Sequence, residues 1–204
     1  LLRALRDHGE KIERRSVELA ADALADILDT LKGELPLGQL RGKEGEAARH
    51  YFGVFDHLIT AQKDDFFFVD RNRRPPLDAM NALLSFVYTL LMHDVRSALQ
   101  TVGLDPAVGF LHVDRPGRPS LALDVMEELR APLADRLVLS LVNRQQVRAK
   151  GFSQSESGAV LMDDATRKEV IVAYQERKKE DVLHPFLDEK VTLGLLPHVQ
   201  AVLL

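Results

Sequence analysis

Ala79-Met-Asn-Ala-Leu-Leu-Ser-Phe-Val-Tyr-Thr-Leu-Leu91 is the stretch of sequence that sets the fold of this chain. Its apolar residues cover every side of a helical projection, and Asn81, Ser85 and Tyr88 are polar interruptions among them. A helix that is apolar all round must be covered all round by other elements. The stretch therefore predicts a central buried helix over about residues 77–102, which Gly103 ends.

Apolar residues recur at helical spacing on both sides of this central segment. They predict helices over residues 1–32, 40–62, 120–147, 163–179 and 194–204. Ser120 suits the N-cap of the third of these, and Pro132 predicts a break within it. Residues 63–76 are expected to be irregular, and residues 159–162 to form a short strand. The predicted fold class is mainly α, with residues 1–204 as one compact multi-helix domain.

Composition restricts the classes of protein to which the chain can belong. The 204 residues carry a net charge of −4, contain 46% hydrophobic residues and include no cysteine. Thiolate metal sites, disulfides and cysteine nucleophiles are thereby excluded, which fits a reducing cytoplasm. No apolar run approaches the roughly 20 residues that span a bilayer, so we expect a cytoplasmic protein without a membrane partner. The leucine at position 1 and the apolar last residues suggest a fragment of a longer protein.

One histidine and several carboxylates follow the central segment. Gly109-Phe-Leu-His112 leads through a turn at Pro116-Gly117 into Ser120-Leu-Ala-Leu-Asp124-Val-Met-Glu127-Glu128. If the latter segment is helical, Asp124 and Glu127 share one face, and the intervening loop lets His112 fold back over it. A carboxylate and imidazole set suits Mg²⁺ or Mn²⁺, whereas Zn²⁺ more often recruits cysteine or further histidines.

Glu44 is a further candidate ligand, because glycines flank it at positions 42 and 45. Each glycine costs a helix roughly 1 kcal/mol relative to alanine, so close approach of a ligand or another helix is expected there. Taken singly, Glu44 could equally serve as a first-turn glutamate, His112 as a buried core residue, and Asp124 and Glu127 as a solvated helix face. No phosphate-binding loop, nucleophile elbow or paired-histidine zinc helix occurs, so the site has ligands but no obvious protein nucleophile.

Taken together, these segments resemble the C-terminal helical domain of CRISPR-associated protein one, the integrase and endonuclease of spacer acquisition. The resemblance runs from about Val17 onward, and its last part, from His184 to Gln200, is most similar to the subtype I-C branch. Four motifs carry it in the family's order: Leu40-Arg-Gly-Lys-Glu44-Gly-Glu-Ala-Ala-Arg-His-Tyr-Phe52, Arg74-Pro-Pro-Leu-Asp-Ala-Met-Asn81-Ala-Leu-Leu-Ser-Phe-Val-Tyr88, Gly103-Leu-Asp-Pro-Ala-Val-Gly-Phe-Leu-His112 and Leu121-Ala-Leu-Asp124-Val-Met-Glu127-Glu-Leu-Arg130.

The resemblance implies that Glu44, His112 and Glu127 bind Mg²⁺ or Mn²⁺ and are the catalytic residues, with Asp124 supporting the site or helping to hold the metal. It also implies insertion of captured DNA into the CRISPR array by transesterification, cleavage of branched DNA, homodimerisation, and CRISPR-associated protein two as a partner. The family's N-terminal β-rich domain is absent from this chain, and Lys43 stands where an apolar residue is expected. Five arginines are the expected contacts to DNA phosphates: Arg74, Arg115, Arg118, Arg130 and Arg136.

Two other functions remain open at the level of sequence. A helical magnesium-dependent nucleotide pyrophosphohydrolase would turn over nucleotides without DNA, and His112 would then have no role. A non-catalytic helical interaction module would need no metal, and its arginines would bind a protein. Neither alternative accounts for Gly42, Gly45 and His112 occurring together with Gly103-Leu-Asp-Pro.

Overall fold

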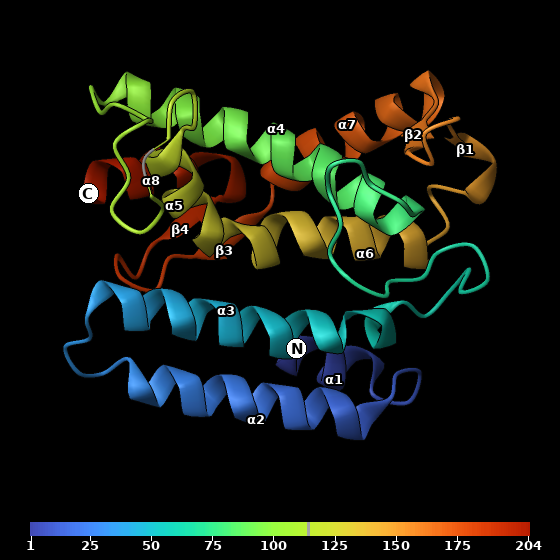
Figure 1. The fold of residues 1–204 in the computed structure, drawn as a ribbon, viewed down its shortest axis with the longest axis horizontal. Coiled ribbons are helices and arrows are strands. Elements are labelled where there is room, and N and C mark those ends of the chain that lie inside the picture. The colour runs from blue at the N-terminus through green and yellow to red at the C-terminus, as the bar shows by residue number, and fades with distance from the viewer. Residues whose placement is uncertain (114) are drawn as a thin grey trace.

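The computed structural model describes residues 1–113 and 115–204. Its helices lie in two layers, with α2 and α3 side by side in one, and α4 to α8 in the other (Figure 1). The elements are α1 (Leu2–His8), α2 (Arg14–Thr30), α3 (Leu37–Gly53), η1 (Phe55–Leu58), α4 (Ala79–Thr101), α5 (Ser120–Leu129), η2 (Arg130–Asp135), α6 (Arg136–Asn143), η3 (Ala149–Gly151), β1 (Phe152–Gln154), β2 (Val160–Met162), α7 (Asp164–Lys178), β3 (Asp181–Leu183), β4 (Lys190–Thr192), η4 (Leu193–Leu195) and α8 (Leu196–Leu203). The predicted mainly α fold is confirmed.

The predicted central helix is α4, and Asp78 caps its first turn by accepting the backbone N–H of Asn81. Its first half is buried on nearly all sides, whereas residues such as His93 and Arg96 expose one side of the second half. The core extends from α4 onto α5, α6, α7 and α8, and Gly103 follows the helix with φ of +84°. The prediction of a buried central helix is therefore confirmed, and an interior helix of this kind fixes the positions of the elements around it.

The predicted single helix over residues 1–32 is wrong, because the chain turns between α1 and α2. Two local features explain the interruption. Gly9 lowers helix stability at that point. Glu13 then caps a new helix, since its side chain accepts the backbone N–H of Ser16 at 2.7 Å.

The break predicted near Pro132 exists as a π-helical turn, η2, between α5 and α6. Proline lacks an amide hydrogen and clashes with the preceding turn, so a wider turn accommodates it better than a regular α-helix. Ser120 was expected to cap α5 from outside, but it is the first residue of the helix and is buried. The turn brings both Arg130 and Asp135 toward α4.

Two antiparallel hairpins complete the fold. The predicted strand at 159–162 is β2, which pairs with β1 so that Ser153 lies opposite Leu161. The sequence analysis predicted no strands between the last two helices, yet β3 and β4 pair there with Val182 opposite Val191. No helix within residues 1–113 and 115–204 is long and apolar enough to cross a membrane.

Candidate metal and DNA site

The loop before α5 is held by one buried carboxylate, Asp124. Its Oδ2 accepts the backbone N–H groups of Phe110 and Leu111 at 2.7 and 2.9 Å, and its Oδ1 accepts that of His112 at 2.8 Å. Asp124 is only 4% exposed. A buried carboxylate with several N–H donors is satisfied without a counter-ion, so it can fix a loop that has no regular structure of its own.

The same carboxylate also sets the orientation of the His112 ring. Nδ1 of His112 lies 2.5 Å from Oδ1 of Asp124. Since an ionised carboxylate only accepts hydrogen bonds, Nδ1 carries a proton, and in the neutral ring Nε2 is the nitrogen with the free lone pair. Burial raises the pKa of Asp124, but the N–H donors from Leu111, His112 and Phe110 outweigh this effect and hold the pKa below its ordinary value. The carboxylate therefore stays ionised at neutral pH.

Glu127 lies one helical turn after Asp124 and faces the free nitrogen of the His112 ring. Its Oε1 is 4.0 Å from Nε2 of His112, and its Oε2 accepts a hydrogen bond from Nη1 of Arg130 at 2.7 Å. Burial raises the pKa of Glu127; the charge of Arg130 opposes this effect, and the charge of Glu44 adds to it. The prediction that Asp124 and Glu127 share one helix face over which His112 folds back is confirmed.

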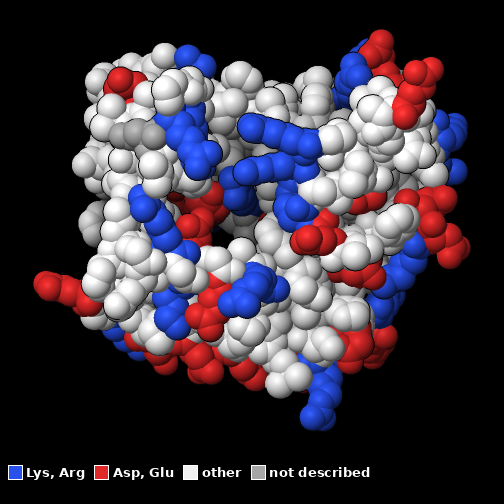
Figure 2. All heavy atoms as spheres, in the orientation of Figure 1, with Lys and Arg blue, Asp and Glu red and all other residues white. Residues whose placement is uncertain are grey.

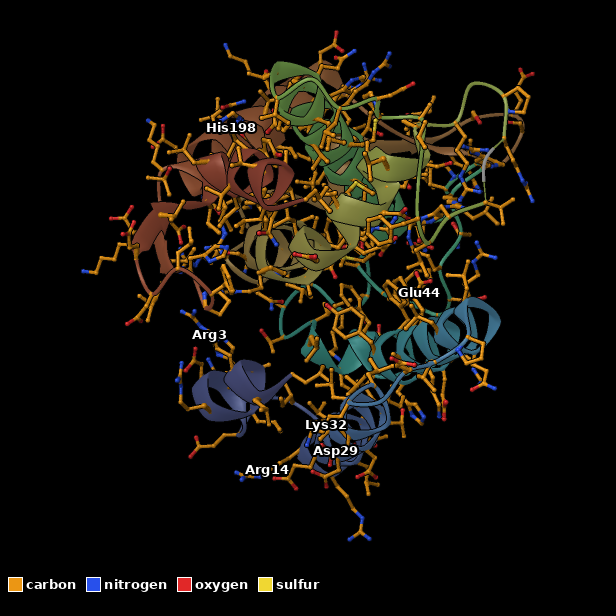
Figure 3. All side chains as sticks on the ribbon, turned by 90° about the vertical axis from the view of Figure 1, so that its left-hand side faces the viewer. Arg3, Arg14, Asp29, Lys32, Glu44 and His198 are labelled. Carbon is orange, nitrogen blue, oxygen red and sulfur yellow. The ribbon has the colours of Figure 1, made fainter. Side chains whose placement is uncertain are left out.

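Glu44 lies on α3 and extends into the space between this helix and the layer that carries α5 (Figure 3). Its side chain is exposed, and its charge acts on Glu127. One turn earlier, Nε of Arg41 donates to the carbonyl of Leu111 at 2.7 Å, which ties α3 directly to the His112 loop. Glu44 is thus near the other two predicted ligands, although it comes from a distant part of the sequence.

The glycines beside Glu44 do not make close contact with another helix, which was one of the two roles predicted for them. A Cβ atom at Gly42 or Gly45 would meet no protein atom within 4 Å. Close approach of another helix is therefore ruled out as their role in this structure. Gly109 is different, because a Cβ atom there would lie 2.7 Å from Cβ of Ser120 and 2.8 Å from Oδ2 of Asp124.

A buried polar network lies behind the site and joins three helical elements. Tyr51 of α3 and Tyr88 of α4 donate their hydroxyls to Asp135 at 2.8 and 2.6 Å. Asp135 is 2% exposed, and burial raises its pKa to about 6 even though both tyrosines and nearby arginines oppose the shift. From the sequence, Tyr88 is predicted only as a polar interruption of the apolar helix. The available sequence signal for this contact was a tyrosine within an apolar helix, 44 residues before the proline at which a later helix is interrupted.

The predicted phosphate-binding arginines do not all lie beside the predicted metal ligands. Arg74 and Arg115 are exposed, Arg118 is half-buried, and Arg130 contacts Glu127. Arg136 instead lies among charged groups of α1 and of the end of α7, and none of the predicted metal ligands is among these neighbours. In Figure 2, Lys and Arg side chains border a hollow on several sides, and Asp and Glu side chains lie inside it.

A protein-family model and curated relatives match this chain under the same family description. A family model described as CRISPR associated protein Cas1 matches residues 1–176. The curated relatives include a CRISPR-associated endonuclease Cas1 of Rhodospirillum rubrum, 59% identical over 208 residues, and one of Chlorobaculum tepidum, 57% identical over 204 residues. Each alignment covers 100% of this chain and 60% of the relative, so the chain spans well under two thirds of these proteins.

Solved structures with the same fold were also found. A CAS1 protein from Thermotoga maritima has a TM-score of 0.74 and 28% identity, over 93% of this chain and 62% of that chain. A casposase bound to an integration product has a TM-score of 0.76 and 26% identity, over 86% of this chain and 51% of that chain. A partial Cas6-RT-Cas1–Cas2 complex, at 24% identity over 98% of this chain and 58% of that chain, shares the fold with a TM-score of 0.80.

Proposed function

The chain belongs to the CRISPR-associated protein Cas1 family, and on that premise we propose that it is the catalytic helical domain of a metal-dependent DNA endonuclease and integrase of CRISPR adaptation. The single observation that carries the proposal is the orientation of His112. Its Nδ1 is bound by Asp124, and its Nε2 faces Glu127. A histidine held in one tautomer by a carboxylate, with its other nitrogen free, is the usual arrangement of a histidine that binds a metal.

The donor set fits one divalent cation. Nε2 of His112 and Oε1 of Glu127 are 4.0 Å apart. Because Mg²⁺ binds its ligands at ~2.1 Å, one ion can contact both atoms. Glu44 is the proposed third ligand, since its exposed side chain can turn toward them. In the described part of the chain, no three His, Asp or Glu side chains are already grouped closely enough to hold an ion. Asp124 is proposed to orient His112, because N–H donors already occupy both of its oxygens.

The proposed metal is Mg²⁺ or Mn²⁺, since two carboxylates and one imidazole suit hard divalent cations. When bound, such an ion polarises a phosphodiester and lowers the pKa of a hydroxyl. Asp124 would orient His112 as a ligand of the ion. The predicted arginines would bind the DNA backbone. In the proposed reaction, a 3′ oxygen of the captured DNA forms a bond to phosphorus, and the bond from phosphorus to the 3′ oxygen of the target breaks. The attacking hydroxyl loses the proton that the leaving oxygen gains.

Several finer features belong to the same proposal. The substrates would be double-stranded and branched DNA, and the casposase bound to its integration product has the same fold as this chain. We carry over from the family resemblance a homodimer, Cas2 as the partner, and the cytoplasm as the location. Residues 1–204 are proposed as one catalytic domain of a longer protein, and residues 184–200 support placement in the subtype I-C branch.

The proposal is tested by measuring strand transfer and cleavage of branched DNA by the full-length protein in the presence of Mn²⁺. We expect Glu44→Ala, His112→Ala and Glu127→Ala each to lower the rate by at least 100-fold while circular dichroism stays unchanged. Arg15→Ala, on the exposed side of α2, serves as a control and should act like the parent protein. Activity that persists in all three alanine variants would overturn the proposed site.

The same assay separates the proposal from the two alternative functions. Turnover of free nucleoside triphosphates without DNA would favour the pyrophosphohydrolase. An absence of metal-dependent DNA chemistry in the parent protein would favour the interaction module. Of the alternatives, the pyrophosphohydrolase leaves the hydrogen bonds that orient His112 without a purpose.

A further inference from the structure

Two arginine side chains from separate segments lie over the ring of Tyr88. The guanidinium carbon of Arg71 is 5.3 Å from the ring centroid, and that of Arg130 is 5.0 Å from it. Each contact is a cation–π interaction, which is favourable. Placing two positive charges at one ring is nevertheless unfavourable for the charges themselves, and the charge of Arg130 adds to the effect of burial in lowering the pKa of Arg71. An arrangement that works against local electrostatics points to a functional role.

Arg71 is fixed in this position by the amino-terminal half of α4. Its Nη1 donates to Oδ1 of Asn81 at 2.6 Å and to the carbonyl of Asn72 at 2.5 Å, and its Nη2 donates to Oγ of Ser85 at 3.1 Å. Asn81 is itself fully buried and donates to Asp78 at 2.7 Å. The irregular segment 63–76 thus positions the guanidinium group of Arg71 beside the Tyr88 ring. The polar residues that interrupt the apolar helix provide the acceptors.

Arg130 is held less completely than Arg71. Its Nη1 donates to Glu127 at 2.7 Å, whereas its buried Nε has no hydrogen-bond partner among the described residues. In the part of the chain that the structure describes, Glu127 is the carboxylate that forms an ion pair with Arg130. When Glu127 shares a divalent cation, that carboxylate is less able to balance the charge of Arg130.

Charge balance then indicates the ligand. Around the Tyr88 ring stand the cations Arg71 and Arg130 and the carboxylates Glu127 and Asp135. A divalent cation held by Glu127 and Glu44 would still leave this group with excess positive charge. An anion that offers several acceptor oxygens, such as a phosphodiester, matches the fork of N–H donors on a guanidinium.

We propose that Arg71 and Arg130, held over the ring of Tyr88, form a clamp for one backbone phosphate of the DNA beside Glu127, with Tyr88 as the positioning residue. This inference rests on the proposed function, because it assumes that DNA reaches the site at Glu127. It adds Arg71 to the phosphate contacts that the sequence predicted. It also requires that metal and DNA increase each other's affinity, since the cation at Glu127 leaves the clamp with its unbalanced charge.

The clamp is tested by the binding of fluorescein-labelled branched DNA in EDTA, followed by anisotropy over a range of NaCl concentrations. Arg71→Met should lower the affinity roughly 10-fold at 0.1 M salt and reduce the salt slope by about 1, as expected for the loss of one phosphate contact. Tyr88→Leu, which removes the ring, should have a similar effect. The charge control Arg15→Ala, on the exposed side of α2, should stay within about twofold of the parent protein.

A second measurement tests the link to the metal. The affinity for Mn²⁺, followed by electron paramagnetic resonance, should rise at least fivefold when the parent protein binds DNA, and Arg71→Met should abolish most of that rise. If the parent binds DNA and Arg71→Met binds it equally well, the clamp is overturned and the proposed function stands. If the parent does not bind DNA at all, the proposed function fails together with the clamp. Should Tyr88→Leu fail to fold, Arg71→Met still decides between these outcomes.

Discussion

His112 and Asp124 are joined twice, because one carboxylate oxygen of Asp124 accepts both the backbone N–H of His112 at 2.8 Å and the ring Nδ1 at 2.5 Å. This double contact fixes where the residue lies and how its ring is turned. A rotation of the ring would break the second bond, so Nε2 remains directed toward Glu127. Asp124 thus fixes the orientation of His112 in the proposed metal site, while the backbone N–H groups of the loop occupy its oxygens.

Asp124→Asn should weaken both the fold and the metal site. The amide offers one acceptor oxygen in place of two, and its NH₂ group faces backbone N–H donors. We expect a loss of about 1–3 kcal/mol in the free energy of unfolding, measured with urea, because buried donors lose their acceptor. Mn²⁺ affinity should fall roughly 10–100-fold. The exposed Asp65→Asn variant should change neither quantity, and unchanged Mn²⁺ binding in Asp124→Asn would contradict the orienting role.

Gly109→Ala should displace the His112 loop from α5. The new methyl group would lie 2.8 Å from Oδ2 of Asp124 and 2.7 Å from Cβ of Ser120, which is closer than such atoms can pack. We expect a loss of about 1–3 kcal/mol in the free energy of unfolding, together with weaker Mn²⁺ binding. Gly33→Ala is the matched control, since Gly33 lies outside the helices and its Cβ would meet no atom within 4 Å. Equal stability of the two variants would show that the loop adapts without cost.

Gly42→Ala and Gly45→Ala should stabilise α3, because both glycines lie within the helix and have open space at the Cβ position. The expected gain is about 1 kcal/mol for each, seen as a higher urea midpoint. Measuring branched-DNA affinity in the same variants tests whether the glycines leave room for the DNA. A more stable variant that binds DNA several-fold more weakly would support that role, whereas unchanged binding would exclude it.

Asp135 should make the stability of the fold depend on pH in the acidic range. Its pKa rises from 3.8 in the unfolded chain to about 6 in the fold, so between these values the folded state binds more protons than the unfolded state. The free energy of unfolding therefore falls as pH rises from 4 to 6, by up to about 3 kcal/mol for this group. Urea unfolding at several pH values should show the parent protein losing stability relative to Asp135→Asn over that interval. The same comparison with the exposed Asp22→Asn should show no trend, and a flat difference for Asp135→Asn would contradict the shift.

Local sequence patterns determined the central helix and part of the candidate site. The apolar run at 79–91 determined α4, because such a helix is stable only when it is covered on nearly every side. The spacing of Asp124 and Glu127 placed both on one helix face, since residues three apart are neighbours on a helix. The predicted helix over 1–32 failed where a weak helix former and a side-chain cap outweighed periodicity, and the hairpin of β3 and β4 has strands too short for a recognisable pattern.

Tertiary structure alone decided how these residues are used. Asp124 and Glu127 look alike in the sequence, yet one is turned into the loop and buried, while the other faces His112 and Arg130. Arg130 and Arg136 also look alike, but the π-helical turn between them sends them to different surfaces. The contact of Tyr88 with Asp135 joins residues 47 positions apart. Such contacts depend on how whole helices pack, and a pattern of neighbours along the chain contains no information about which distant carboxylate or guanidinium will lie opposite a given side chain.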